Sequence, residues 1–246
     1  FILGLPRAGS TLLEQILSSH SLVEGTMELP DIPHIAGQLG SIDHWPEKLA
    51  NAPPEDLKRM GETFLERTRI QRKSGKPFFI DKLPNNWLHV GLIHQILPNA
   101  KIIDARRHPM ACCFSNFKQH FARGQGFTYS QTDIGRYYAD YVDYMAHIDR
   151  VLPGRVVRMF HEDMVDDGER EIRRLLDALG LPFEESCLRF WENDRAVRTA
   201  SSEQVRRPIF KEGTEQWLMF EPYLDPLKAA LGPVLSAYPA VPASFL

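Results

Sequence analysis

A glycine-containing segment near the start of the chain has the residue types of an anion-binding loop. The run Gly4-Leu-Pro-Arg-Ala-Gly-Ser-Thr11 follows an apolar stretch and matches the pattern G-x-x-x-x-G-K-[ST], except that Ser10 replaces the lysine. Glycines let consecutive backbone N–H groups face one concavity, and the N-terminus of a following helix adds partial positive charge. Without the lysine that contacts β- and γ-phosphates, the loop suits a smaller anion, such as a phosphate that carries one further group. The alternative interpretation is a tight turn between a strand and a helix.

Arg107 and Ser115 form a second candidate anion site. Arg107 follows an apolar run, and Pro109 fits the first turn of a helix, which places Ser115 about two turns into that helix. A guanidinium fork and a hydroxyl can hold one phosphate from two sides. The same spacing is also typical of two unrelated surface residues, so the pair by itself leaves both interpretations open.

These residues depend on strands and helices that must place them together. Each of four short apolar runs is followed by apolar residues at the spacing of one helix face. One such helix face covers 172–179, and Gly180 is its predicted C-terminal end. This alternation predicts a three-layer α/β fold of the P-loop type, with a mainly parallel sheet flanked by helices. Ligands bind such sheets beyond the carboxyl ends of the strands, where both candidate sites lie. The predicted strands are Phe1–Leu5, Phe78–Asp81, Ile102–Ala105 and Val156–Phe160.

Composition excludes several classes of protein. The 246 residues include 29 Lys and Arg against 32 Asp and Glu, so the net charge of −3 argues against a general nucleic-acid-binding protein. No apolar run is long enough to span a membrane. Three cysteines and nine histidines show no zinc spacing, and we expect no metal. The cysteine usage and the missing leader favour a cytoplasmic location, and the start without Met indicates an N-terminally truncated chain.

Together, the two candidate sites resemble those of the sulfotransferases that use 3′-phosphoadenosine 5′-phosphosulfate (PAPS). The 5′-phosphosulfate loop of that family, P-R-[SA]-G-[ST]-T, corresponds to residues 6–11, and its R-x7-S element corresponds to Arg107 and Ser115. The resemblance is closer to the tyrosylprotein type and to bacterial relatives that often follow tetratricopeptide repeats. It implies a sulfotransferase domain at residues 1–235, a tail at 236–246 and a repeat region before Phe1. The similar blocks are 1–17, 81–86, 89–93, 98–103, 200–205 and Trp217.

The resemblance implies which residues bind the donor. The loop would bind the 5′-phosphosulfate, while Arg107 and Ser115 would bind the 3′-phosphate. His161 stands where the family has a tyrosine, and we expect it near the adenine. Arg206, Arg207 and Lys211 lie in a basic segment that could close over the nucleotide, and the sequence does not choose among them. The loop residues are Arg7, Ala8, Gly9, Ser10 and Thr11.

The resemblance also implies the catalytic residues. Glu28 is the predicted general base for the acceptor hydroxyl, with Glu14 and Glu24 as nearby competitors. Lys82 is the predicted general acid or charge stabiliser at the leaving oxygen, at the end of a predicted strand. Ser201 would help to hold the transferring group, although the adjacent serine is an alternative.

The predicted function is transfer of a sulfuryl group from PAPS to an acceptor hydroxyl, such as a peptide tyrosine, a carbohydrate or a small alcohol. Residues 31–75 are expected to shape the acceptor cleft. Two other functions stay open. One is a Mg²⁺-dependent nucleotide kinase or hydrolase with a diverged loop, and the other is an inactive nucleotide-binding module.

Overall fold

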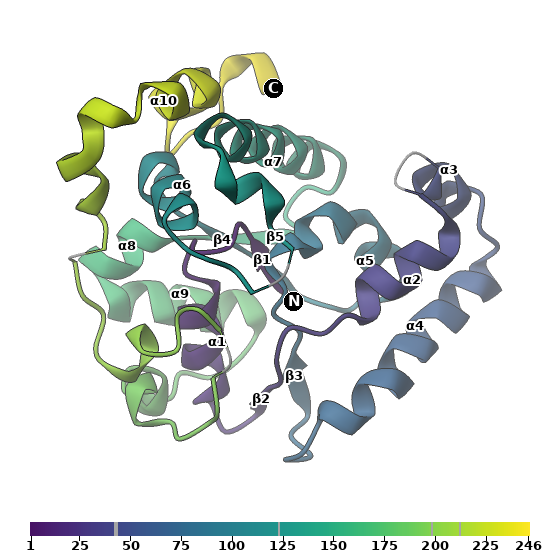
Figure 1. Cartoon of the computed structure of the whole chain (residues 1–246). Coiled ribbons are helices and arrows are strands. Elements are labelled where there is room, and N and C mark those ends of the chain that lie inside the picture. The colour runs from purple at the N-terminus through teal and green to yellow at the C-terminus, as the bar shows by residue number, and fades with distance from the viewer. Residues whose placement is uncertain (42–43, 123, 198, 212) are drawn as a thin grey trace.

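Three parallel strands form the centre of the structure, and each coincides with a predicted apolar run. The computed structural model describes residues 1–41, 44–122, 124–197, 199–211 and 213–246 (Figure 1). The strand order is β1-β4-β5, so the first strand lies beside one that follows almost a hundred residues later. The strands are β1 (Ile2–Gly4), β4 (Ile102–Arg106) and β5 (Val156–Phe160).

A second parallel pair extends this sheet. Strand β2 (Val23–Gly25) pairs with β3 (Phe78–Ile80). The N–H of Ile2 donates to the carbonyl of Asp81 at 3.0 Å, and Ile2 also bridges Lys82, which brings β3 beside β1. The sequence did not predict β2, because a three-residue Val-Glu-Gly run carries too little apolar pattern to be recognised.

Helices cover both sides of the sheet, which confirms the predicted α/β architecture. Helix α1 packs on β1 and α9 packs on β5, whereas α6 and α7 lie on the opposite side of the strands (Figure 1). The covering helices are α1 (Ser10–Ser18), α5 (Val90–Ile96), α6 (Pro109–Phe117), α7 (Gln131–Val151), α8 (His161–Asp166) and α9 (Gly168–Leu179). Two further helices, α10 (Asp225–Leu231) and α11 (Pro233–Ala237), pack on the outside of α6 and α7.

Three further helices form a lobe that projects from the side of the sheet (Figure 1). They are α2 (Asp31–Leu39), α3 (Trp45–Ala50) and α4 (Pro54–Thr68). Helix α2 packs against both of the others, and Arg67 Nε forms an ion pair with Asp31 Oδ1 at 2.7 Å. The lobe separates β2 from β3 in the chain.

Helix boundaries follow the local signals of the sequence. Pro109 occupies the first turn of α6, and Gly180 ends α9 in a left-handed conformation with φ 73°. Short 3₁₀ helices fill many connections: η1 (Arg69–Gln71), η2 (Pro84–His89), η3 (Gly126–Tyr129), η4 (Glu185–Cys187), η5 (Phe190–Glu192), η6 (Gln204–Arg206), η7 (Gln216–Tyr223) and η8 (Ala243–Phe245).

The C-terminal residues contact the body of the protein. The hydroxyl of Tyr238 donates to Glu162 Oε2 at 2.5 Å, and Arg150 donates to the carbonyl of Phe245. The division of the chain into a domain at 1–235 and a tail stays a prediction. Among the described residues, no helix is both long enough and apolar enough to cross a membrane.

A buried charge cluster lies under the end of β4. Asp104 is fully buried and forms ion pairs with Arg106 at 3.1 Å and Arg158 at 2.9 Å, and the hydroxyl of Tyr141 donates to it. Burial alone would raise the pKa of the Asp104 carboxyl, but the two guanidinium groups and the hydroxyl outweigh burial and lower it. The aspartate therefore stays ionised and neutralises an arginine that is itself only 2% exposed.

We expect Asp104→Ala to reduce the free energy of unfolding by about 3–5 kcal/mol, because it leaves Arg106 buried without its counter-charge. Urea unfolding measures this loss. Glu62→Ala is the control, since it removes an exposed ion pair with Lys58 and should cost less than about 1 kcal/mol. Equal losses in the two variants would contradict a structural role for the buried cluster.

Candidate active site

The predicted anion-binding loop joins β1 to α1. Helix α1 begins at Ser10, and Gly9 precedes it with φ 104°, a conformation that side chains other than glycine rarely adopt. A Cβ at Gly9 would lie 3.2 Å from His161 Nδ1, so the loop passes close to the start of α8. Ser10 and Thr11 are buried at the N-terminus of α1, where backbone N–H groups favour a bound anion.

Arg7 connects the loop to two distant segments. Its backbone is left-handed, with φ 64°, which is uncommon for a residue with a side chain. Its Nε donates to Ser115 Oγ at 3.1 Å, and its Nη1 donates to Ser201 Oγ at 2.5 Å and to the carbonyl of Ala200 at 3.0 Å. Its Nη2 donates to Gln204 Oε1 at 3.2 Å. The structure thus brings Arg7 into contact with Ser115, a predicted donor-binding residue, and with Ser201, a predicted catalytic residue.

Arg107 lies against the same loop. Its Nη1 donates to the carbonyl of Arg7 at 3.0 Å, its Nη2 donates to the carbonyl of Gly213, and its buried Nε has no hydrogen-bond partner among the described residues. Burial, and then Arg107, lowers the pKa of Arg7, and burial also lowers the pKa of Arg107. The half-buried Arg7 and the buried Arg107 carry like charges that disfavour each other, and a bound anion would relieve that cost.

A cavity with polar and aromatic walls surrounds these side chains. Its walls include both arginines, Ser115, Ser201 and His161. Aromatic side chains complete the walls: Phe114, Phe190, Phe210 and Trp217. The walls therefore combine phosphate-binding groups with rings on which a base can stack.

The structure separates the three basic residues between which the sequence could not choose. Arg207 lines the cavity and stacks on Phe210 with 3.6 Å between Cζ and the ring centroid. Arg206 instead donates to the carbonyls of Asn193 and Arg195, and Lys211 forms an exposed ion pair with Asp166 at 3.7 Å.

Glu28 and Lys82 form a separate pair. Lys82 Nζ lies 2.5 Å from Glu28 Oε1, and the lysine side chain is 1% exposed whereas the glutamate side chain is 45% exposed. Lys82 follows β3, and its N–H donates to the carbonyl of Met27 at 3.4 Å. The neighbouring Asp81 is not the partner of this lysine side chain. The pair thus presents a carboxylate to solvent and keeps a buried ammonium behind it.

The two groups of residues meet at Thr199. The hydroxyl of Thr199 lies 3.2 Å from that of Thr11, which lines the cavity around Arg7. Thr199 also lines a second cavity of about 420 Å³ that includes Glu28. No contact in the described structure joins Arg7 directly to Glu28 or Lys82.

The predicted competitors of Glu28 have other partners. Glu24 accepts hydrogen bonds from the backbone N–H groups of Lys73 and Ser74, and Glu14 pairs with Arg195 at 3.2 Å. Of the three glutamates, Glu28 is the one whose side chain pairs with Lys82, the predicted general acid.

Sequence reasoning missed Thr199, Gln204 and Gly213, which all contact the anion-binding groups. They carry no charge and lie in a segment without a strong period, so their types offered no signal. Their nearness to the basic residues of 195–211 was the available clue. Among the described residues, no group of three or more His, Cys, Asp or Glu side chains lies close enough together to hold a metal ion.

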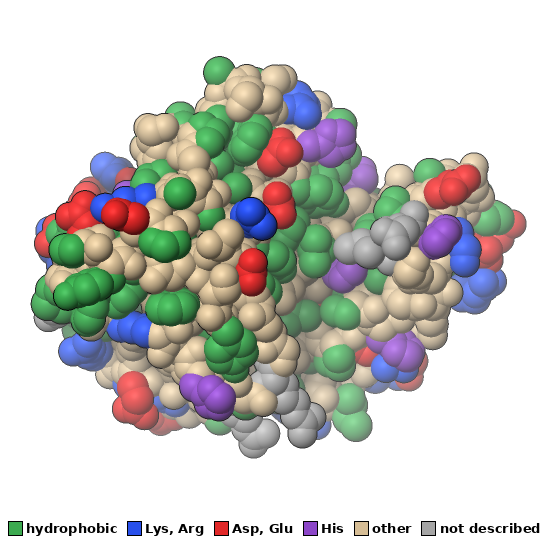
Figure 2. Space-filling view, turned by 45° about the horizontal axis from the view of Figure 1, so that its top comes forward, with side chains coloured by type: hydrophobic (Ala, Val, Ile, Leu, Met, Phe, Trp, Pro, Cys, Tyr) green, Lys and Arg blue, Asp and Glu red, His purple; other side chains and the backbone are tan. Residues whose placement is uncertain are grey.

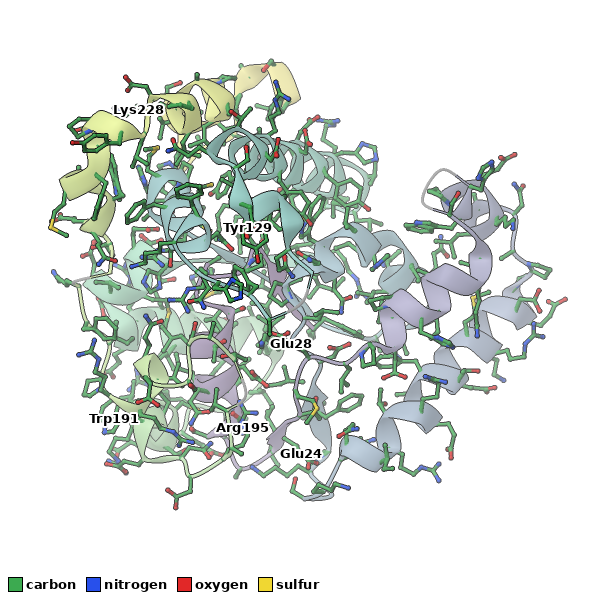
Figure 3. The ribbon with its side chains drawn as sticks, viewed as in Figure 1. Glu24, Glu28, Tyr129, Trp191, Arg195 and Lys228 are labelled. Atoms are coloured by element: carbon green, nitrogen blue, oxygen red, sulfur yellow. The ribbon has the colours of Figure 1, made fainter. Side chains whose placement is uncertain are left out.

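The α2–α4 lobe borders a hollow of the surface. Figure 2 shows this hollow between the lobe and the rest of the protein, with hydrophobic side chains along it. Figure 3 places Glu28 on the segment that leads from β2 towards the lobe. The three helices of the lobe belong to the segment 31–75 that was predicted to shape an acceptor cleft, but the cavity that contains Glu28 is lined by Gln71, Lys73 and Ser74 of that segment rather than by the helices.

Comparisons with known proteins agree with this geometry. The profile described as "Sulfotransferase family" matches residues 1–185. An uncharacterized protein of Aquifex aeolicus is 35% identical over 92% of this chain, but the chain spans only about a third (31%) of the length of that relative. A Caenorhabditis briggsae protein that carries the provisional name protein-tyrosine sulfotransferase is 25% identical over 88% of this chain and 79% of its own length.

Solved structures show the same fold. The sulfotransferase domains of the Synechococcus PCC 7002 olefin synthase and of the curacin biosynthetic pathway both align with a TM-score of 0.62 and 20% identity. Each alignment covers 89% of this chain, with 86% and 89% of the two domains, respectively.

His161 generates a testable pH dependence. Burial, and then Arg107, lowers the pKa of His161 from 6.5 to about 4. Between these two pH values the unfolded chain binds a proton that the folded chain does not, so the free energy of unfolding should fall as the pH is lowered through this window. Urea unfolding at several pH values should show that the free energy of unfolding depends less on pH in His161→Gln than in the wild type. The exposed His34→Gln is the control, and identical slopes in all three proteins would show that His161 is not held neutral.

Proposed function

Because this chain belongs to the sulfotransferase family, we propose that it moves a sulfuryl group from PAPS to a hydroxyl group of an acceptor. The observation that carries this proposal is the contact of Arg7 with both Ser115 and Ser201. These side chains come from three distant segments, and the resemblance assigns Arg7 and Ser115 to the donor and Ser201 to the transferring group. A tight turn between a strand and a helix would not by itself require Arg7 to contact both serines.

The anion-binding groups are suited to a donor with two separate anionic ends. The loop 6–11 offers the N-terminus of α1, together with Arg7 and two hydroxyls, to the 5′-phosphosulfate. Arg107 and Ser115 are available to a 3′-phosphate, and Arg207 can add a further positive charge. The walls that include His161 and Trp217 provide flat surfaces for the adenine. This distribution of charge supports PAPS rather than a triphosphate with Mg²⁺.

Glu28 and Lys82 supply the groups that the transfer requires. The acceptor oxygen forms a bond to sulfur while the bond between sulfur and the bridging phosphate oxygen breaks. The Glu28 carboxylate takes the proton of the acceptor hydroxyl, and the Lys82 ammonium stabilises the charge on the leaving oxygen. Ser201, held by Arg7, orients the transferring group. Because Lys82 rests on Glu28 without substrates, the donor must attract the ammonium towards its bridging oxygen.

The acceptor approaches through the cavity of about 420 Å³ that Glu28 lines. The Glu28 side chain is 45% exposed, so a hydroxyl can reach its carboxylate from solvent. A peptide tyrosine is one such acceptor, since one relative bears the name protein-tyrosine sulfotransferase. Carbohydrates and small alcohols carry the same reactive group. All three belong in the assay.

Adenosine 3′,5′-bisphosphate should stabilise the protein strongly. A ligand at about a hundred times its Kd adds ~2.7 kcal/mol, which for a domain of this size raises Tm by roughly 5–11 °C. AMP should produce a much smaller shift, because it lacks the 3′-phosphate. Differential scanning fluorimetry with the bisphosphate, AMP, and ATP with Mg²⁺ gives the comparison.

The outcomes of this comparison separate the candidate functions. A shift only with ATP and Mg²⁺ would favour a kinase or hydrolase. The absence of any shift in a folded protein would remove the support for a PAPS site. A bisphosphate shift without turnover of ³⁵S-labelled PAPS on any of the three acceptor classes would indicate an inactive nucleotide-binding module.

Glu28→Gln should lower kcat by at least 100-fold and leave the affinity for the bisphosphate within about twofold, because the amide cannot accept the hydroxyl proton. Transfer of ³⁵S from PAPS and isothermal titration with the bisphosphate measure the two effects. Glu66→Gln changes an exposed glutamate that pairs with Arg69, and this control should behave as wild type. Wild-type turnover in Glu28→Gln would rule out Glu28 as the base.

A further inference from the structure

A buried ion pair outside the proposed chemistry joins two segments of the site. Glu14 on α1 and Arg195, which precedes the segment of Ser201, approach to 3.2 Å between Oε1 and Nη1. Their side chains are only 2% and 17% exposed. Removing two charges from water is costly, so the pair must be held by further contacts or perform a task that an apolar pair would not.

Arg195 makes those further contacts with the segment that carries Glu28. Its Nη1 donates to the carbonyl of Thr26 at 3.2 Å, and its Nη2 lies 3.5 Å from Gln15 Oε1. Thr26 precedes Glu28 by two residues. One guanidinium thus connects α1, the helix that follows the anion-binding loop, to the backbone two residues before Glu28. Arg195 and Glu28 are both labelled in Figure 3.

The opposite side of this segment is held by β3. Thr26 Oγ1 donates to the carbonyl of Ile80 at 2.5 Å, and the N–H of Lys82 donates to the carbonyl of Met27. Strand β3 therefore fixes one side of the segment, while Arg195 holds the carbonyl of Thr26 from elsewhere. Without Arg195, the segment 26–28 would lose this hydrogen bond at Thr26 and keep its contacts with Ile80 and Lys82.

Gly25 is shaped to receive the guanidinium. A Cβ at this position would lie 2.9 Å from Arg195 Nε and 3.0 Å from Cζ, closer than real contacts of this kind. It would also lie 2.8 Å from the Cβ of Ser18 on α1. The absent side chain lets the flat guanidinium approach the backbone beside Thr26. A lysine in place of the arginine could not keep the same two-nitrogen geometry, because its ammonium is a single point of charge.

The same arginine reaches the segment that holds Ser201. The carbonyl of Arg195 accepts a hydrogen bond from Arg206 Nη2 at 2.6 Å, and its N–H donates to Asn193 Oδ1 at 3.0 Å. The backbone of Arg195 therefore contacts η6, which begins three residues after Ser201, while its side chain contacts Thr26.

We propose that Arg195, anchored on Glu14, is a positioning residue that holds the 26–28 segment so that Glu28 faces both Lys82 and the acceptor. This inference rests on the proposed function, since it assigns Arg195 a task that depends on Glu28 being the base. Arg195 also lines the cavity that contains Glu28. Arg195 acts through the Thr26 carbonyl and takes no proton.

Two variants test this role from opposite sides. Arg195→Lys keeps the charge but loses the fork. Gly25→Ala keeps every charge but crowds the guanidinium and, on its other side, the Cβ of Ser18 on α1, so Arg195→Lys is the more specific of the two. Because a shift of about 1 Å at a reacting group can cost about 100-fold in rate, each should lower kcat by about 10- to 100-fold. The acceptor KM and the Kd of adenosine 3′,5′-bisphosphate should stay within threefold of wild type. Arg189→Lys, in an exposed pair with Glu185, is the matched control and should change none of these values.

A measurement without turnover completes the test. Hydrogen exchange of the backbone N–H groups of residues 24–30 should accelerate at least tenfold in both variants, while exchange in the loop 6–11 stays as in wild type. Unchanged kcat together with unchanged exchange would overturn the positioning role. A parallel fall in Tm, bisphosphate affinity and kcat would also overturn it, in favour of a general structural role. If exchange at 24–30 accelerates in the variants but the wild-type protein transfers no sulfuryl group, the contact made by Arg195 is confirmed and the proposed function is refuted.

Discussion

The guanidinium of Arg7 is the interaction on which the arrangement of the site depends. It lies in a left-handed turn after β1 and donates to side chains of α6 and of the segment that precedes η6. Its partners Ser115 and Ser201 are 108 and 194 residues away in the chain. A cationic fork with several donors in one plane suits this task, because each acceptor constrains the others. The strained backbone is maintained because those contacts over-determine its position.

Buried charge recurs around the sheet, and in each case a specific partner makes it tolerable. Asp104 compensates Arg106 beneath β4, and Glu14 compensates Arg195 beside β2. The pair of Arg7 and Arg107 differs, since it brings two like charges close together, whereas the other two pairs join opposite charges. An anion bound beside both guanidinium groups, as we propose for the donor, would compensate their charge.

Local chemistry accounts for the parts of the fold that the sequence predicts well. The strands at 102–106 and 156–160 are apolar runs, Pro109 starts α6, and Gly180 ends α9. Strand β2 escaped prediction because it exists through pairing with β3, more than fifty residues later, rather than through an intrinsic pattern. The lobe of α2, α3 and α4 is likewise placed by contacts that no local period describes.

The sequence by itself determined four of the five strands of the described structure, the residues of the anion-binding loop and the resemblance to sulfotransferases, because these depend on residue type and short spacing. Only the tertiary structure decided that Glu28 rather than Glu14 or Glu24 pairs with Lys82, and that Arg207 rather than Arg206 or Lys211 lines the cavity. It also decided that Arg195 holds the backbone beside Glu28. The physical reason is that an ion pair is selected by distance in space and by burial. Charged residues of the same type look alike in the sequence until the fold places one of them against a partner.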